Sequence, residues 1–122
     1  MAYIQCKSGG AETPTLLWTN PNPSTDKYAF DVALDLSNYQ GIMIECRSQI
    51  FDSVYSKSIF VKTSDEQCMG AYSPGYGAVI RRFNIYDDKV AFQLGYYNGK
   101  NSTSFVCIPT RIWGYKKMNF PT

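Results

Sequence analysis

Histidine, the residue most often used to move protons or to hold metals, is absent from this chain of 122 residues. Without it, the chain lacks the usual general base, the Ser-His-Asp and Cys-His nucleophile systems and the favoured transition-metal ligand. Paired carboxylates can still hydrolyse glycosides. However, Asp31 and Asp35 lie on the polar side of an alternating strand pattern, and Asp87-Asp88 falls in a predicted turn. We therefore expect no catalytic residues, no metal and no cofactor.

The cysteines are widely spaced, and no two of them form a Cys-x-x-Cys pair. In a reducing compartment such thiols usually behave as small hydrophobic side chains. We expect free thiols, buried or half-buried, with one disulfide formed after release from the cell as the alternative. The four residues concerned are Cys6, Cys46, Cys68 and Cys107.

Tyrosine is abundant, with ten residues in the chain. Exposed tyrosine rings can stack on a sugar or cover a contact between proteins. The segment 67–77 is rich in glycine and aromatic residues and low in charge, which makes it the best candidate for a functional loop. The alternative is that these tyrosines are half-buried strand residues or subunit contacts. The candidate surface-contact residues are Tyr72, Tyr76, Tyr96 and Tyr97.

The first 14 residues are predicted to form a flexible arm ahead of a single domain spanning residues 15–122. Gly9-Gly10 supplies the joint of this arm. Tyr3 and Ile4 are the candidate contact residues of the arm, because an extended segment can add a strand to the sheet edge of a neighbouring subunit. A frayed or self-docked terminus is the alternative.

The domain itself is predicted to consist of β-strands. Large apolar residues occupy every second position from Tyr28 to Leu36, including Val32 and Leu34, and this period of two places them on one face of a strand. No segment has a convincing helical period. We expect an all-β fold, a single antiparallel β-sandwich of jelly-roll type. The expected strands are residues 15–19, 28–36, 42–47, 53–63, 76–86, 89–96, 103–108 and 110–115, with a loop at 64–75.

Several details follow from the same pattern. The strands at 28–36 and 42–47 are expected to pair, because a short loop joins them. Asn98-Gly99 predicts a tight turn, and Pro109 predicts an edge strand or a bulge. Trp18 and Trp113 are expected in the core. The residues expected to point inward are Ile42, Ile44 and Cys46 in one strand and Val90, Phe92, Leu94 and Tyr96 in another.

Composition excludes some partners. The formal net charge is +2, and charges of both signs are interspersed without the basic stripe of a nucleic-acid-binding protein. No run approaches the ~20 apolar residues of a membrane helix, so we expect no membrane insertion. The first residues do not resemble a secretory signal, and we expect the protein to be made and kept in the cytosol or to leave the cell by lysis.

Three groups of residues form an ordered pattern along the chain. The first is Leu17–Ser24 with Val32–Tyr39 and Ile44–Arg47, the second Arg81–Phe83 with Val90–Phe92, and the third Ile108–Lys116. Together they cover most of residues 15–117. This pattern resembles domains of virion structural and tail-region proteins from phages that infect Gram-positive gut bacteria. The resemblance implies a part of the virion, without fixing which part, and carries over no catalytic or metal-binding residues.

The expected function is therefore that of a non-enzymatic phage virion structural protein in the tail, baseplate or fibre, or a receptor-binding component. Its expected partners are copies of itself and other virion proteins, with a host-surface glycan as a possible ligand. Three alternatives remain open: a capsid decoration or head-fibre protein, a carbohydrate-binding module, and a small regulator or inhibitor encoded by a prophage.

Overall fold

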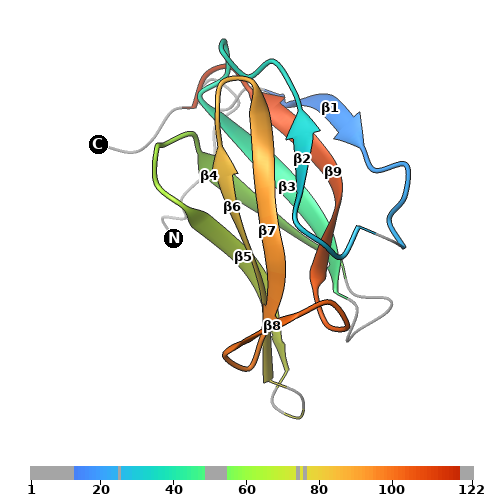
Figure 1. Ribbon diagram of the computed structural model, residues 1–122. Coiled ribbons are helices and arrows are strands. Elements are labelled where there is room, and N and C mark those ends of the chain that lie inside the picture. Colours follow the sequence, from blue (N-terminus) through green and yellow to red (C-terminus); the bar gives the residue numbers. More distant parts are fainter. Residues whose placement is uncertain (1–12, 25, 49–54, 74, 76, 119–122) are drawn as a thin grey trace, which may run out of the picture.

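The computed structural model describes residues 13–24, 26–48, 55–73, 75 and 77–118, and these form two antiparallel sheets that pack face to face (Figure 1). The predicted antiparallel β-sandwich is confirmed. One sheet has four strands in the order β1-β9-β3-β4, and the other has five, in the order β2-β7-β6-β5 with β8 beside β7. The strands are β1 (Thr15–Thr19), β2 (Phe30–Ala33), β3 (Gly41–Ser48), β4 (Tyr55–Val61), β5 (Gln67–Ser73), β6 (Gly77–Ile85), β7 (Lys89–Tyr97), β8 (Lys100–Ser102) and β9 (Cys107–Tyr115).

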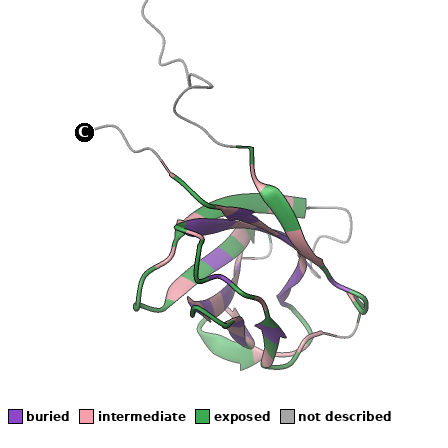
Figure 2. Ribbon diagram, turned by 90° about the horizontal axis from the view of Figure 1, so that it is seen from above, coloured by how far each residue is buried: buried purple, intermediate pink, exposed green. Residues whose placement is uncertain are grey.

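Buried apolar side chains from both sheets fill the space between them. Figure 2 marks the buried positions of the strands in purple. At the centre, Phe83 from β6 lies edge-on to Phe60 of β4, with ring centroids 4.7 Å apart. It also packs against Phe92 of β7, at 5.8 Å. This contact joins the two sheets through aromatic rings. The buried members of the core are Val32, Leu36, Ile42, Ile44, Cys46, Met69, Val79, Phe83, Ile85, Val90, Phe92, Cys107 and Ile112.

The second strand is shorter than its alternating pattern predicts. Tyr28 lies before β2 and is 64% exposed. Leu34 lies beyond β2, and its amide donates to the carbonyl of Asp88 at the turn between β6 and β7. Leu34 is half-buried against the core, and Leu36 is completely buried. The apolar pattern therefore correctly marks burial here, but the regular ladder ends at Ala33.

The predicted pairing of this strand with residues 42–47 is wrong. β2 pairs with β7, whereas β3 pairs with β4 and β9. The short loop after β2 carries the chain from one sheet to the other. The connections β1–β2, β4–β5 and β8–β9 also cross between the sheets. Two strands with one apolar face each can bury those faces side by side or across the core, and their sequences do not distinguish the two arrangements.

The segment predicted as a loop at 64–75 contains a strand. β5 pairs with β6 along its whole length, from Gln67 opposite Phe83 to Ser73 opposite Gly77. The candidate functional loop at 67–77 is therefore an edge strand and its connection to β6. Its alternation is hard to recognise because only Met69 is both large and buried.

Two bulges account for further departures from the predicted pattern. In β9, Glu45 lies opposite Arg111 and Cys46 opposite Pro109, which leaves Thr110 as an extra residue. The bulge expected at Pro109 is confirmed, but residues 107–115 form one central strand instead of two. A bulge tolerates proline because the ladder of hydrogen bonds is already interrupted there.

The second bulge lies in β7, where Gly95 is opposite Arg81 and Phe92 is opposite Phe83. The extra residue reverses the alternation, so that Tyr96 faces outward and Leu94 is only half-buried. The inward positions of Val90 and Phe92 are confirmed, whereas the prediction for Tyr96 is wrong. The tight turn that follows is confirmed, because Asn98 and Gly99 have φ angles of 48° and 84°.

The most unusual core residue is Arg81, whose side chain is completely buried on the inner face of β6. Its guanidinium group lies 5.6 Å from the ring of Phe30 and 5.9 Å from that of Phe92. Burial lowers its pKa to about 10, so the group stays charged at neutral pH. It donates hydrogen bonds to four backbone carbonyls, those of Asp26, Tyr28, Gln93 and Cys107.

Candidate interaction face

The outer surface of the four-stranded sheet carries a row of apolar side chains that crosses every strand. Leu16 lies opposite Trp113, Trp113 opposite Met43, and Met43 opposite Ile59. Leu16 is 50% exposed, Ile59 55%, and Val61 on the same side of β4 39%. We call these five residues the apolar stripe. Trp113 was expected in the core, but it lies on the outer face, whereas Trp18 packs against the core as predicted.

A charged row borders the apolar stripe, two residues further along each strand. Arg111 donates to both carboxylate oxygens of Glu45, from Nε at 2.9 Å and from Nη2 at 2.8 Å. Lys57 lies on the other side of Glu45, with Nζ 3.9 Å from Oε2. Both cations also lie about 5 Å from the ring of Trp113. We call Lys57, Glu45 and Arg111 the basic row, because its two cations and one anion leave a charge of +1.

The bulge in β9 explains how a glutamate can be buried here. Glu45 is only 5% exposed. The extra residue, Thr110, donates its hydroxyl to Glu45 Oε1 at 2.8 Å. The hydrogen bond from Arg111 is the main cause that holds the pKa of Glu45 below its ordinary value of 4.5, and it outweighs the effect of burial. The same pairing raises the pKa of Arg111.

The free energy of unfolding should therefore depend on pH through Glu45. The pKa of Glu45 is lower in the folded chain than in the unfolded chain, so its carboxylate stabilises the fold at any pH above its ordinary pKa. This stabilisation is lost as the pH falls through the lowered pKa of the folded chain. We expect Glu45→Gln to reduce the free energy of unfolding near neutral pH by roughly 1–2 kcal/mol, the range for hydrogen bonds to a charged group with one partner partly exposed. The difference from the parent should shrink toward zero in acid. Urea unfolding at a series of pH values measures it.

The exposed ion pair between Lys62 and Asp87 provides a control for this prediction. Its N–O distance is 2.7 Å, but the side chain of Asp87 is 75% exposed. Asp87→Asn should therefore have a much smaller effect at every pH. If the two variants showed the same pH dependence, Glu45 would not be the group responsible.

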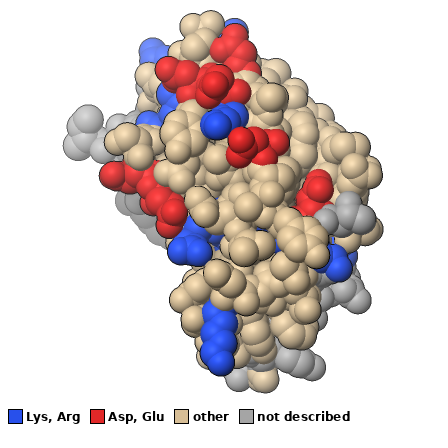
Figure 3. Space-filling view, viewed as in Figure 1, with Lys and Arg blue, Asp and Glu red and all other residues tan. Residues whose placement is uncertain are grey.

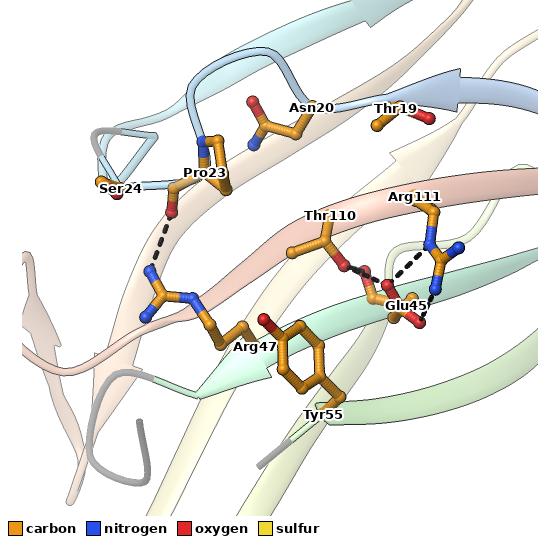
Figure 4. Close-up of a pocket in the computed structure, with 9 residues that line it drawn as sticks. All are labelled: Thr19, Asn20, Pro23, Ser24, Glu45, Arg47, Tyr55, Thr110 and Arg111. Carbon is orange, nitrogen blue, oxygen red and sulfur yellow. Dashed lines mark hydrogen bonds and ion pairs between the residues drawn. The ribbon is translucent and has the colours of Figure 1, made fainter. Parts of the chain in front are cut away.

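A polar hollow of about 720 Å³ lies at the end of this face beyond the basic row (Figure 4). Its rim on one side is the loop after β1, which is held in place by Asn20. The amide Nδ2 of Asn20 donates to the carbonyl of Pro109, and its Oδ1 accepts from the backbone of Asn22. Arg47 donates across the hollow from Nη2 to the carbonyl of Pro23, at 3.0 Å. The lining residues are Thr19, Asn20, Pro23, Ser24, Glu45, Arg47, Tyr55, Thr110 and Arg111.

Charge of the opposite sign gathers at one end of the other sheet, as the red atoms in the upper part of Figure 3 show. Asp35, Asp87 and Asp88 surround a shallow depression there. Lys62 pairs with Asp87, and Lys89 lies 3.4 Å from Asp31. We call this region the acidic end. Its four carboxylates and two lysines, Asp31, Asp35, Asp87, Asp88, Lys62 and Lys89, leave a charge of −2.

The four candidate surface-contact tyrosines do not form one surface in the structure. Tyr72 and Tyr96 share the outer face of the five-stranded sheet. Tyr72 is 71% exposed, whereas Tyr96 lies under the guanidinium of Arg82, 5.1 Å from it. Tyr97 turns inward, packs against the core and lies 4.8 Å from the ring of Phe105. Tyr76 and both arm residues, Tyr3 and Ile4, lie outside the described residues.

The cysteines within the described residues are free, as expected, but not all are covered. Cys46 and Cys107 are buried, whereas Cys68 is exposed on β5. The thiol of Cys46 lies 3.1 Å from the hydroxyl of Ser56. Cys6 lies outside the described part of the chain. Across that part, no cluster of three or more histidine, cysteine or acidic side chains could hold a metal ion.

No protein-family model, curated protein or solved structure matches this chain. Among the described residues, no helix is long and apolar enough to cross a membrane. The apolar stripe, the basic row and the polar hollow are therefore the features from which a function can be argued.

Proposed function

We propose that this chain is a non-enzymatic structural protein of a phage virion, located in the tail region, and that it assembles with copies of itself through the apolar stripe. The observation that carries the proposal is the stripe itself. Large apolar side chains form a continuous row across all strands of one sheet, exposed on the two edge strands and half-buried on the two central ones. Contiguous exposed apolar surface in a protein is typical of a contact with another molecule.

The occupant we propose for the stripe is a second copy of the same chain. The basic row beside the stripe carries +1, and the acidic end carries −2. These regions lie on different sheets, so the basic face of one copy can meet the acidic end of the next. A two-fold contact would instead bring two basic rows together, which opposes association. Head-to-tail contacts of this kind form a ring when the rotation between successive copies closes, and an open filament when it does not; we propose the ring.

The virion and tail location rest on the resemblance of the three groups of residues within 15–117 to phage structural domains. A ring of small β-sandwiches suits a tail, where proteins stack around an axis. A capsid decoration or head-fibre protein would use the same face, and labelling purified particles with an antibody against the chain distinguishes the two locations by electron microscopy. Label at the tail is expected; label on the head would move the protein there, and unlabelled particles would overturn the proposal.

Self-association can be tested by light scattering coupled to size-exclusion chromatography. The parent chain is expected to elute as an oligomer, and its dissociation should increase at high salt because charge complementarity contributes. Ile59→Lys should give monomers, because it places a charge at the most exposed side chain of the stripe. The matched control is Tyr72→Lys, a comparably exposed residue of the other sheet's edge strand.

The control variant should remain oligomeric. A monomeric parent chain would contradict self-assembly. Loss of the oligomer in Tyr72→Lys but not in Ile59→Lys would move the contact to the tyrosine-bearing face of the five-stranded sheet. Far-ultraviolet circular dichroism of both variants confirms that each retains its strands.

A further inference from the structure

We infer that the polar hollow beside Arg47 and Tyr55 binds a sugar that carries a carboxylate group. This inference does not depend on the proposed function, because the hollow lies at the end of the sheet away from Val61 and would be present in a monomer. Its volume of about 720 Å³ suits a small ligand.

The charge available for a ligand comes from Arg47. Among the described residues that line the hollow, Glu45 is the only acidic one, and both of its carboxylate oxygens are occupied by Arg111, with Thr110 and Lys57 as further partners. Within the described residues, the one hydrogen bond of the Arg47 guanidinium group goes to the carbonyl of Pro23, which is neutral. Most of its five N–H donors thus remain for an anion, and its fork geometry fits a carboxylate.

Tyr55 supplies the surface for a sugar ring. It lies directly opposite Arg47 in the pairing of β3 with β4 and is 56% exposed. Figure 4 shows the two side chains next to each other at one end of the hollow, with the Glu45–Arg111 pair at the other end. An aromatic face beside a guanidinium group can stack on a pyranose ring while its carboxylate is bound. The hydroxyls of Thr19 and Ser24 complete the polar rim.

A peptide carboxylate fits this hollow less well. A peptide is usually held by backbone amides that pair with it as a strand. Two amides of the rim are already used within the chain: that of Asn20 donates to the carbonyl of Thr110, and that of Asn22 donates to the side chain of Asn20. Side chains of the hollow supply donors as well, which suits the scattered hydroxyl groups of a saccharide.

Titrations followed by amide NMR spectra test the inference, with glucuronic acid, glucose, acetate and an acidic dipeptide as separate probes. Glucuronic acid should bind with shifts confined to residues around the hollow, and glucose and acetate about tenfold more weakly or worse. Arg47→Gln should weaken glucuronic acid binding at least about tenfold, as expected for losing a charge-assisted pair of hydrogen bonds. Tyr55→Ala should weaken both sugars and leave acetate unchanged.

Arg82→Gln is the matched control, because Arg82 also lies beside a tyrosine but is on the other sheet. This variant should bind glucuronic acid like the parent. The inference is overturned if Arg47→Gln binds glucuronic acid unchanged, if acetate binds as tightly as the sugar acid, or if the dipeptide is the preferred probe. The amide spectra also report whether each variant is folded, and the Tyr55 variant tests the site separately if Arg47→Gln is not.

Discussion

Replacing Arg81 by methionine should lower the free energy of unfolding by about 3–5 kcal/mol, because a buried acceptor left without its donor costs about 1–3 kcal/mol. Methionine fills much of the same space but donates no hydrogen bond. The backbone carbonyls of Asp26, Tyr28, Gln93 and Cys107 would lose their donor. These acceptors lie in β7, in β9 and in the segment before β2. We expect Arg81→Lys to recover part of the loss, because an ammonium group can reach only some of them.

The neighbouring Arg82 is the control for this measurement. It faces outward, stacks on Tyr96 and makes no hydrogen bond through its buried Nε. Arg82→Met should cost at most about 1 kcal/mol, the value of an exposed cation–π contact. Urea unfolding followed by tryptophan fluorescence measures both variants. Equal losses in the two would show that the hydrogen bonds of Arg81 do not stabilise the sandwich.

Truncation of Phe83 should have a comparable effect, for a different reason. The side chain is completely buried and touches Phe60 in one sheet and Phe92 in the other. Phe83→Ala leaves a cavity between two sheets that cannot close fully around it. We expect a loss of about 3–5 kcal/mol in the free energy of unfolding.

Phe105 provides the matched control, because it is 40% exposed and rests on Tyr97. Phe105→Ala should cost about 1 kcal/mol, the value of one aromatic pair. A similar loss in both variants would indicate that the core relaxes around the missing ring. Binding of an apolar dye to Phe83→Ala, but not to Phe105→Ala, would independently report loosened packing.

The fold class could be predicted from the sequence because an alternation of apolar and polar residues is visible among residues that are close in sequence. Val32, Ile42, Ile44 and Phe92 are buried as their positions predict. The failures have local causes as well. The extra residue in β7 reverses the face of Tyr96, and small residues hide the alternation of β5 around Met69.

The candidate site could not be predicted, because it depends on which strands are neighbours. The partners Glu45 and Arg111 are 66 residues apart and meet only because β9 inserts beside β3. The outward-facing, half-buried position of Trp113 has the same origin, since tryptophan is usually taken as a core residue. Arg81 is the clearest case: it occupies an inward position between Val79 and Phe83, but its charge argues against burial until the four carbonyls around it are known.

The central position of β9 has a consequence for synthesis on the ribosome. β9 lies between β1 and β3, so the first described strand has no partner until the last one has been translated. The hairpin of β3 with β4 and the meander from β5 to β7 can form earlier, because their partners are close in sequence. A nascent chain that ends before Cys107 therefore leaves two unpaired strand edges, which can join to other unfinished chains. Once β9 has been made, it pairs with both β1 and β3, and these two edges can no longer join to other chains.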